Sequence, residues 1–253
     1  MDNRHLHFLA GLPRSGSTVL TRILNQHPDA FATTTSPFLD YVLPAVEHLK
    51  RIQREHSSGH HIRTQRILQS AAFSFYDTTA SHIIDKNRGW LPNRLAIQAD
   101  LLPDPRIVVT LRPIEQVVAS FYRVLNLENG GTESPEQIFV GRVSEIYLAM
   151  KAVADQREHL CLVTYHQLVN QPQETMARIE SYLGMDHHTY DFGNIQDPDP
   201  EDDSKWGIAG LHTIRPQLAD TSIQPQDIMT RTELKFCQQL TQELYDAYAI
   251  PVQ

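Results

Sequence analysis

Short apolar runs alternate along the chain with longer segments in which apolar residues recur at helical spacing. The short runs predict buried strands, because they are bounded by turn signals and are too short for helices. We expect strands at residues 8–10, 30–33, 82–85, 106–111 and 160–165. The intervening segments predict helices at residues 17–26, 37–55, 62–79, 91–102, 113–125, 135–156, 172–183 and 231–247. This alternation indicates an α/β fold: a single domain over residues 1–253, with a central, mostly parallel sheet flanked by helices and a ligand site at the carboxyl ends of the strands.

Two regions depart from the simple alternation. A helical insertion over about residues 37–80 separates two of the predicted strands, and we expect it to form the substrate-binding side of an enzyme, although plain packing explains it equally well. A C-terminal segment over about residues 193–216 is expected to be lid-like. It contains five acidic residues within the seven residues 197–203, which we expect to form a solvated loop, with a mobile lid as the alternative.

The strand at residues 8–10 leads into a Gly-rich loop, Gly11 to Gly16, and then into a helix that begins at Ser17. The free backbone N–H groups and the positive end of such a helix favour a phosphate. The spacing is close to a Walker A loop, but Ser17 stands where the lysine belongs, and Arg14 supplies the basic group instead. The strand at 106–111 is followed by Arg112 rather than by the acid that would hold magnesium. We therefore expect a phosphate-binding loop that works without a metal.

The stretch Gly-Leu-Pro-Arg-Ser-Gly-Ser-Thr at residues 11–18 resembles the 5′-phosphosulfate loop of sulfotransferases. The resemblance is to the branch that includes tyrosylprotein sulfotransferases and many bacterial enzymes. It implies a P-loop NTPase-like sulfotransferase fold and 3′-phosphoadenosine 5′-phosphosulfate (PAPS) as the donor, with PAP as its product. It also implies that the donor is bound by Pro13, Arg14, Ser15, Gly16, Ser17 and Thr18.

A second match concerns the 3′-phosphate of the donor. Arg112 ends a predicted central strand, and Ser120 lies eight residues later in the following helix, which resembles the Arg and Ser of the family's 3′-phosphate site. A guanidinium offers forked donors to a phosphate, and a hydroxyl adds another. Arg123 is one turn further on and is expected to reach the same group, although its offset differs by one residue from the tyrosylprotein pattern.

The stretch that follows the strand at 82–85 carries the candidate catalytic cation. Lys86 lies 26 residues before Arg112, as does the catalytic lysine of the tyrosylprotein branch. Related bacterial sequences resemble the following Asn-Arg-Gly-Trp more closely, and some lack the lysine. Asn87 and Arg88 therefore remain open as substitutes for Lys86.

Two later stretches resemble other donor-binding parts of the family. Residues 163–169 resemble a Tyr-Glu-x-Leu segment with His166 in place of the acid, which implies that Tyr165 packs on adenine, unless it is simply a core residue. Residues 205–216 resemble a basic, Gly-containing segment that folds over the donor. This second match implies donor contacts for Lys205, Trp206 and Arg215.

The expected reaction is an in-line transfer of a sulfuryl group to an acceptor hydroxyl or amine, with Arg14 and Lys86 stabilising charge on the leaving phosphate. The acceptor must also lose a proton to a base. The tyrosylprotein branch has a Glu base a few residues after the His-Pro that ends the first helix, whereas residues 32–36 here contain no carboxylate. His212 is our candidate base, with Asp85 as the second choice.

Composition narrows the possible partners. The chain has 253 residues and a formal net charge of −8, which argues against a nucleic-acid-binding surface. Its two cysteines form no metal motif and are expected to be reduced thiols, and no apolar run approaches the length of a membrane span. We expect a cytoplasmic enzyme that acts on a small-molecule or peptide acceptor, with neither a bound metal nor a membrane partner; its oligomeric state is left open.

Two other functions compete with a sulfotransferase. A non-catalytic module that holds PAP or another bisphosphonucleotide would keep Arg14, Arg112 and Ser120 but need no base. A P-loop kinase or nucleoside triphosphatase is opposed by Ser17 in place of the lysine and by the missing acid at the strand end.

Overall fold

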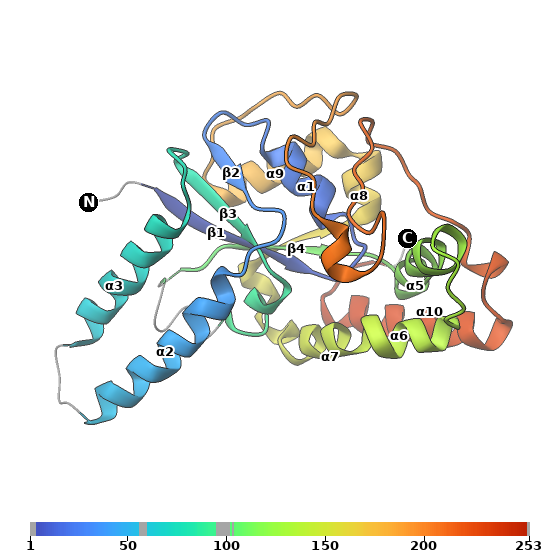
Figure 1. Cartoon of the computed structure of the whole chain (residues 1–253), viewed down its shortest axis with the longest axis horizontal. Helices are drawn as coiled ribbons and strands as arrows, with labels where there is room; N and C mark the ends of the chain where they lie inside the picture. The colour runs from blue at the N-terminus through green and yellow to red at the C-terminus, as the bar shows by residue number, and fades with distance from the viewer. Residues whose placement is uncertain (1–3, 56–59, 95–101, 103, 252–253) are drawn as a thin grey trace.

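A five-stranded parallel sheet forms the centre of the computed structural model, which describes residues 4–55, 60–94, 102 and 104–251 (Figure 1). The strand order is β2-β3-β1-β4-β5, and every neighbouring pair is parallel. The strands are β1 (His5–Gly11), β2 (Ala30–Ala32), β3 (His82–Lys86), β4 (Ile107–Leu111) and β5 (Leu160–Thr164). All five sequence-predicted strands are thereby confirmed, with ends shifted by at most one residue except at β1, which begins three residues before the predicted run.

Helices cover both faces of the sheet (Figure 1). They are α1 (Ser17–Leu24), α2 (Phe38–Glu55), α3 (His60–Phe75), α5 (Ile114–Tyr122), α6 (Pro135–Arg142), α7 (Ser144–Ala152), α8 (Tyr165–Asn170), α9 (Pro172–Leu183) and α10 (Arg231–Ala247). Strand residues alternate between two cores: Phe8 packs in one, with α2, α3, α5, α6, α7 and α10, and Leu9 packs in the other, with α1, α8 and α9. The helical pair α2 and α3 lies between β2 and β3 in the chain and projects to one side (Figure 1).

Most helix boundaries follow local signals. The predictions for residues 172–183 and 231–247 match α9 and α10, and Gly184 ends α9 in the left-handed conformation. The prediction of one helix over 135–156 is wrong, because the chain leaves helical geometry at Val143, between α6 and α7. Val143 is β-branched and fully buried, so core packing overrides the periodic pattern there. The predicted helix over 91–102 lies largely outside the described residues.

Two further expectations concern the cysteines and membrane spans. Cys161 and Cys237 are both buried and free, as predicted, and burial raises the pKa of Cys161 to about 11 and that of Cys237 to about 12. Such thiols stay protonated and unreactive at neutral pH. Within the described part of the chain, no helix combines the length and apolar character needed to cross a membrane.

The register of the sheet determines where the site forms. Leu9 of β1 pairs with Lys86 of β3, and Gly11 pairs with Thr110 of β4. Because all strands are parallel, the segments that follow β1, β3, β4 and β5 leave the same edge of the sheet. The loop after β1 is therefore flanked by Lys86 and Arg112.

Candidate functional site

A cavity of about 880 Å³ lies at this carboxyl edge. Its lining combines the β1–α1 loop, the ends of β3 and β4, part of α5, the start of α8 and a C-terminal stretch around residues 208–221. Most of the residues predicted to bind a donor line this cavity: Arg14, Gly16, Ser17, Thr18, Arg112, Ser120, Arg123, Tyr165 and Arg215. The predicted catalytic residues Lys86 and His212 line it as well.

The loop after β1 is held in an unusual conformation. Gly11 has φ 131°, and a Cβ at this position would lie 2.1 Å from the Thr110 carbonyl oxygen, so only glycine fits. Ser15 is buried, and its Oγ lies 2.7 Å from the Thr110 Oγ1. The Ser15 side chain therefore braces the loop from inside the protein and does not line the cavity. Gly16 begins α1 without a side-chain cap, so the first-turn N–H groups remain for another acceptor.

Arg14 lies at the centre of the loop with φ 56°, a conformation that side-chain-bearing residues seldom adopt. Its Nε donates to the Ser120 Oγ at 3.1 Å, and a terminal nitrogen donates to the Leu211 carbonyl. Burial and, secondarily, the nearby Arg112 lower the pKa of Arg14 to about 10, so the guanidinium stays charged at neutral pH. Arg14 therefore connects the loop to α5 and to the C-terminal stretch.

Arg112 follows β4 and faces the other side of the loop. It donates to the Arg14 carbonyl at 2.9 Å and to the Ser222 hydroxyl, and its guanidinium stacks over the Tyr165 ring at 4.0 Å from the centroid. Burial lowers its pKa from the usual arginine value. Tyr165 begins α8 rather than ending β5, as the Thr164 cap defines the helix start.

Arg123 lies on the helical turn that continues α5, at residues 123–128. It donates to the Thr221 carbonyl at 2.7 Å, and its Nε lies 3.3 Å from a carboxylate oxygen of Glu128. Three arginines and Ser120 thus meet at one end of the cavity, which makes this end strongly basic in an otherwise acidic protein.

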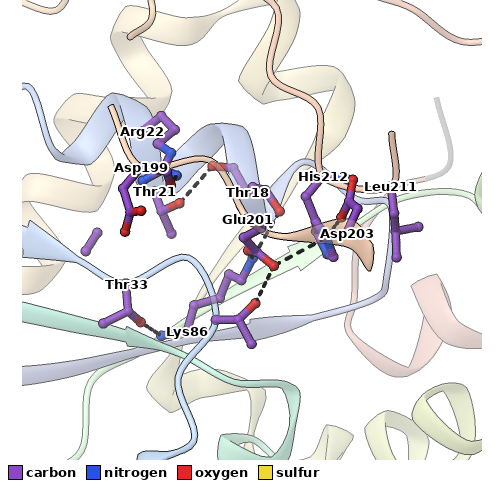
Figure 2. Close-up of polar contacts among 12 residues, drawn as sticks. Thr18, Thr21, Arg22, Thr33, Lys86, Asp199, Glu201, Asp203, Leu211 and His212 are labelled. Carbon is purple, nitrogen blue, oxygen red and sulfur yellow. Dashed lines mark hydrogen bonds and ion pairs between the residues drawn. The ribbon is translucent and has the colours of Figure 1, made fainter. Parts of the chain in front are cut away.

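Lys86 ends β3 and points toward the start of α1 (Figure 2). Its Nζ donates to the Thr18 Oγ1 at 3.0 Å and lies 3.5 Å from the Glu201 Oε1. Burial lowers the pKa of Lys86 to about 8, and the Glu201 carboxylate opposes part of that shift. The two substitutes suggested by the sequence, Asn87 and Arg88, both line the cavity. The Asn87 side-chain oxygen also accepts from the Gly89 N–H as a turn cap, whereas Arg88 is exposed.

The two candidate bases occupy different environments. His212 lines the cavity, and its Nδ1 lies 2.7 Å from Asp203 and 3.3 Å from Glu201. Asp85 is fully buried and accepts hydrogen bonds from the Tyr76 hydroxyl at 2.6 Å and the Trp90 indole at 2.5 Å, and burial raises its pKa. Asp85 therefore supports the core and is not positioned to meet a substrate in the cavity.

The prediction that residues 197–203 form a solvated loop holds for only part of this run, because residues 198–200 and 202 are exposed whereas residues 197, 201 and 203 are partly buried. Asp197 lies 2.5 Å from Arg22, and Glu201 and Asp203 contact Lys86 and His212 (Figure 2). The Glu201 side chain is only 8% exposed. Sequence analysis missed Glu201 as a site residue, although the acidic run itself was the available signal. The cations that neutralise this run come from distant parts of the chain.

Other predicted donor contacts lie elsewhere. Pro13 is buried within the loop and Lys205 is exposed, and neither lines the cavity. The Trp206 side chain lies outside what the structure describes. Among the described residues, no three His, Cys, Asp or Glu side chains are grouped as a metal site.

Comparison with known proteins identifies the family of this site. The model of the sulfotransferase family matches residues 7–189. The chain belongs to the sulfotransferase family. The match includes the β1–α1 loop, Lys86, Arg112 and Tyr165, whereas Glu201 and His212 lie beyond it.

Relatives and solved structures agree with this assignment. The chain is 27% identical over 224 residues to the nodulation protein NoeE of Sinorhizobium fredii, covering 75% of this chain and 52% of that protein, so it spans about half the length of this curated relative. A sulfotransferase from Alicyclobacillus acidocaldarius has the same fold, with a TM-score of 0.57, 14% identity and coverage of 98% and 97% of the two chains. Mouse sulfotransferase SULT7A1 complexed with PAP gives a TM-score of 0.54, 16% identity and coverage of 97% and 85%. The fold is therefore the P-loop-like α/β fold of sulfotransferases.

Proposed function

We propose that the chain transfers a sulfuryl group from PAPS to a hydroxyl or amine of a small-molecule or peptide acceptor and releases PAP. The observation that carries this proposal is the meeting of Arg14, Lys86 and Arg112 around the uncapped N-terminus of α1 in one cavity. Three cations and a helix N-terminus suit a donor with anionic groups at both ends. Family membership and the PAP complex of the mouse structural neighbour support the same donor.

Different residues would bind different parts of the donor. The β1–α1 loop, with Ser17 and Thr18 at the start of α1, would hold the 5′ end. Arg112, Ser120 and Arg123 would hold the 3′-phosphate, since all three line the cavity beside Arg14. The Tyr165 ring, already stacked against Arg112, would pack on adenine.

In the proposed reaction, the acceptor oxygen or nitrogen attacks sulfur while the bond between sulfur and the leaving phosphate oxygen breaks. Negative charge grows on that phosphate oxygen, where Arg14 and Lys86 would stabilise it. His212 would take the acceptor proton, and Asp203 holds the imidazole through Nδ1. No metal is needed in this scheme, because side-chain cations and N–H groups supply the positive charge.

A thermal-shift comparison of PAP, ATP and AMP, with and without EDTA, tests donor binding. PAP should stabilise the protein most, by about 2.7 kcal/mol at about 100 times its Kd, and EDTA should not change this. Labelled PAPS with a panel of acceptors then tests transfer. Equal stabilisation by PAP and AMP would contradict a 3′-phosphate site, and PAP binding without any transfer across a wide panel would favour a non-catalytic PAP-binding module.

A further inference from the structure

The acidic strap, defined here as residues 197–203, places the Glu201 carboxylate beside Lys86, one of the residues that line the cavity (Figure 2). The Glu201 carboxylate lies 3.5 Å from the Lys86 Nζ and accepts a hydrogen bond from the Thr35 hydroxyl at 2.8 Å. Lys86 in turn donates to Thr18 in the first turn of α1. Glu201 therefore lies beside the lysine and close to the helix N-terminus, where an incoming anion would bind.

The strap and the residues just after it engage all three groups that we assign to catalysis. Lys86 contacts Glu201, His212 contacts Asp203, and Arg14 donates to the Leu211 carbonyl. These three contacts come from a single segment, residues 201–211. A ligand that needs the same cations must take the place of contacts that the chain already makes with itself.

We infer that Glu201 is an internal competitor of the donor: its carboxylate occupies the anion side of Lys86, and donor binding requires its displacement. This inference depends on the proposed function, because it concerns the same anion site. A carboxylate and a phosphate or sulfonate group present similar charged oxygens to a lysine and a helix N-terminus. Two such anions beside one ammonium would repel each other, so the two states exclude one another.

The local backbone is compatible with displacement. Residues 197–201 belong to neither a helix nor a strand. The strap is held by contacts with distant side chains: Asp197 and the Asp199 carbonyl contact Arg22, and Asp203 contacts His212. Moving Glu201 away from Lys86 would therefore break no backbone hydrogen bond of the central sheet.

Glu201→Gln tests the inference because it keeps the side-chain shape and removes the competing charge. Asp199→Asn is the matched control: it removes one charge from the same strap, but the Asp199 residue is exposed and its side chain is not the group that contacts Lys86. We expect Glu201→Gln to bind PAP about tenfold more tightly than the unmodified chain in calorimetric titration, and Asp199→Asn to stay within about twofold. Without PAP, Glu201→Gln should melt at a lower temperature, because Lys86 loses its buried counter-ion.

The outcomes separate this inference from other roles and from the proposed function. If folded Glu201→Gln binds PAP no more tightly than the unmodified chain does, the inference is overturned. Glu201 would then be a structural or proton-accepting group. If the unmodified chain and Glu201→Gln both fail to bind PAP, the proposed function fails as well. If Glu201→Gln does not fold, Thr35→Val decides the question: it removes the hydroxyl that holds Glu201, so it should tighten PAP binding in the same direction, and no change would overturn the inference.

Discussion

At the scale of single residues, positively charged side chains lie close to one another in the cavity. Burial and the neighbouring Arg112 both lower the pKa of Arg14, and burial lowers that of Lys86. Arg14 also has a backbone φ of 56°, which costs on the order of 1–3 kcal/mol for a residue with a side chain. Strain and repulsion of this kind persist where they prepare a site for an oppositely charged ligand.

Arg112 should contribute mainly to donor affinity. Replacing it with alanine removes charge-assisted hydrogen bonds worth about 1.5–3 kcal/mol each, so PAP binding should weaken by about 10- to 100-fold in calorimetry. Arg112→Lys should recover little of the loss, because lysine lacks the planar fork that stacks on Tyr165. Normal PAP affinity in folded Arg112→Ala would remove the proposed 3′-phosphate contact.

Lys86 should make PAP affinity depend on pH. Its pKa is lowered to about 8 by burial, so the ammonium is present below that pH and is lost as the pH rises through it. Affinity for PAP should therefore fall above about pH 8, by at most about tenfold per pH unit. Calorimetric titrations from pH 7 to pH 9.5 measure this trend. Lys86→Met is the control: its affinity should be lower and nearly flat over this range, and an equally steep fall would assign the effect to another group.

At the scale of elements, the turn from β1 to α1 is the feature that other segments are built around. Its close approach to β4 requires a residue without a side chain at Gly11, where an added Cβ would collide with the Thr110 backbone. By contrast, an added Cβ at Gly130 meets no atom within 4 Å, although its φ of 71° is also positive. Comparing substitutions at the two glycines therefore distinguishes the cost of a positive φ from the cost of a steric collision.

Gly11→Ala should destabilise the protein far more than Gly130→Ala. We expect Gly130→Ala to cost about 1–2 kcal/mol from its backbone conformation alone. Gly11→Ala adds the collision, and should cost more than about 4 kcal/mol or prevent folding. Urea unfolding followed by circular dichroism measures both. Similar stabilities for the two variants would show that the β1–β4 contact tolerates movement.

At the scale of the whole molecule, ionisable side chains lie at both edges of the sheet: cations line the cavity, and histidines lie at the opposite edge. Opposite the cavity, His5 and His82 pair across β1 and β3, and the His7 Nε2 lies 3.0 Å from the His82 Nδ1. Burial, followed by the charge of neighbouring histidines, lowers the pKa of His7 to about 3 and also lowers that of His82. The rings of His7 and His82 are therefore neutral in the folded protein at neutral pH.

This histidine cluster should make the protein sensitive to acid. The unfolded chain takes up a proton on His7 near pH 6.5 and the folded chain only near pH 3, so stability is complete above about pH 6.5 and declines as the pH falls below it. Between pH 7 and pH 5 the expected loss from His7 is on the order of 1–2 kcal/mol in urea unfolding. His7→Phe should show a loss smaller by that amount, and an identical pH dependence would contradict the prediction.

Local patterns in the sequence were sufficient for most of the architecture. The change from a short apolar run to helical spacing at Ser17 located the β1–α1 turn, and the apolar run at residues 106–111 located a central strand. Because strands alternate with helices, the strands run parallel, and residues at the ends of different strands, such as Lys86 and Arg112, lie at the same edge of the sheet. These inferences succeed because periodicity and strand direction are properties of consecutive residues.

The partners of the acidic strap were decided only by the tertiary structure. Glu201 meets a lysine 115 positions away, and Asp203 holds the imidazole of His212. In the sequence, a run of acids has no visible counter-ion, and a solvated loop is its simplest interpretation. Whether a carboxylate faces water or a buried cation depends on which distant segments the fold brings together, and hydrophobic periodicity carries no information about that pairing.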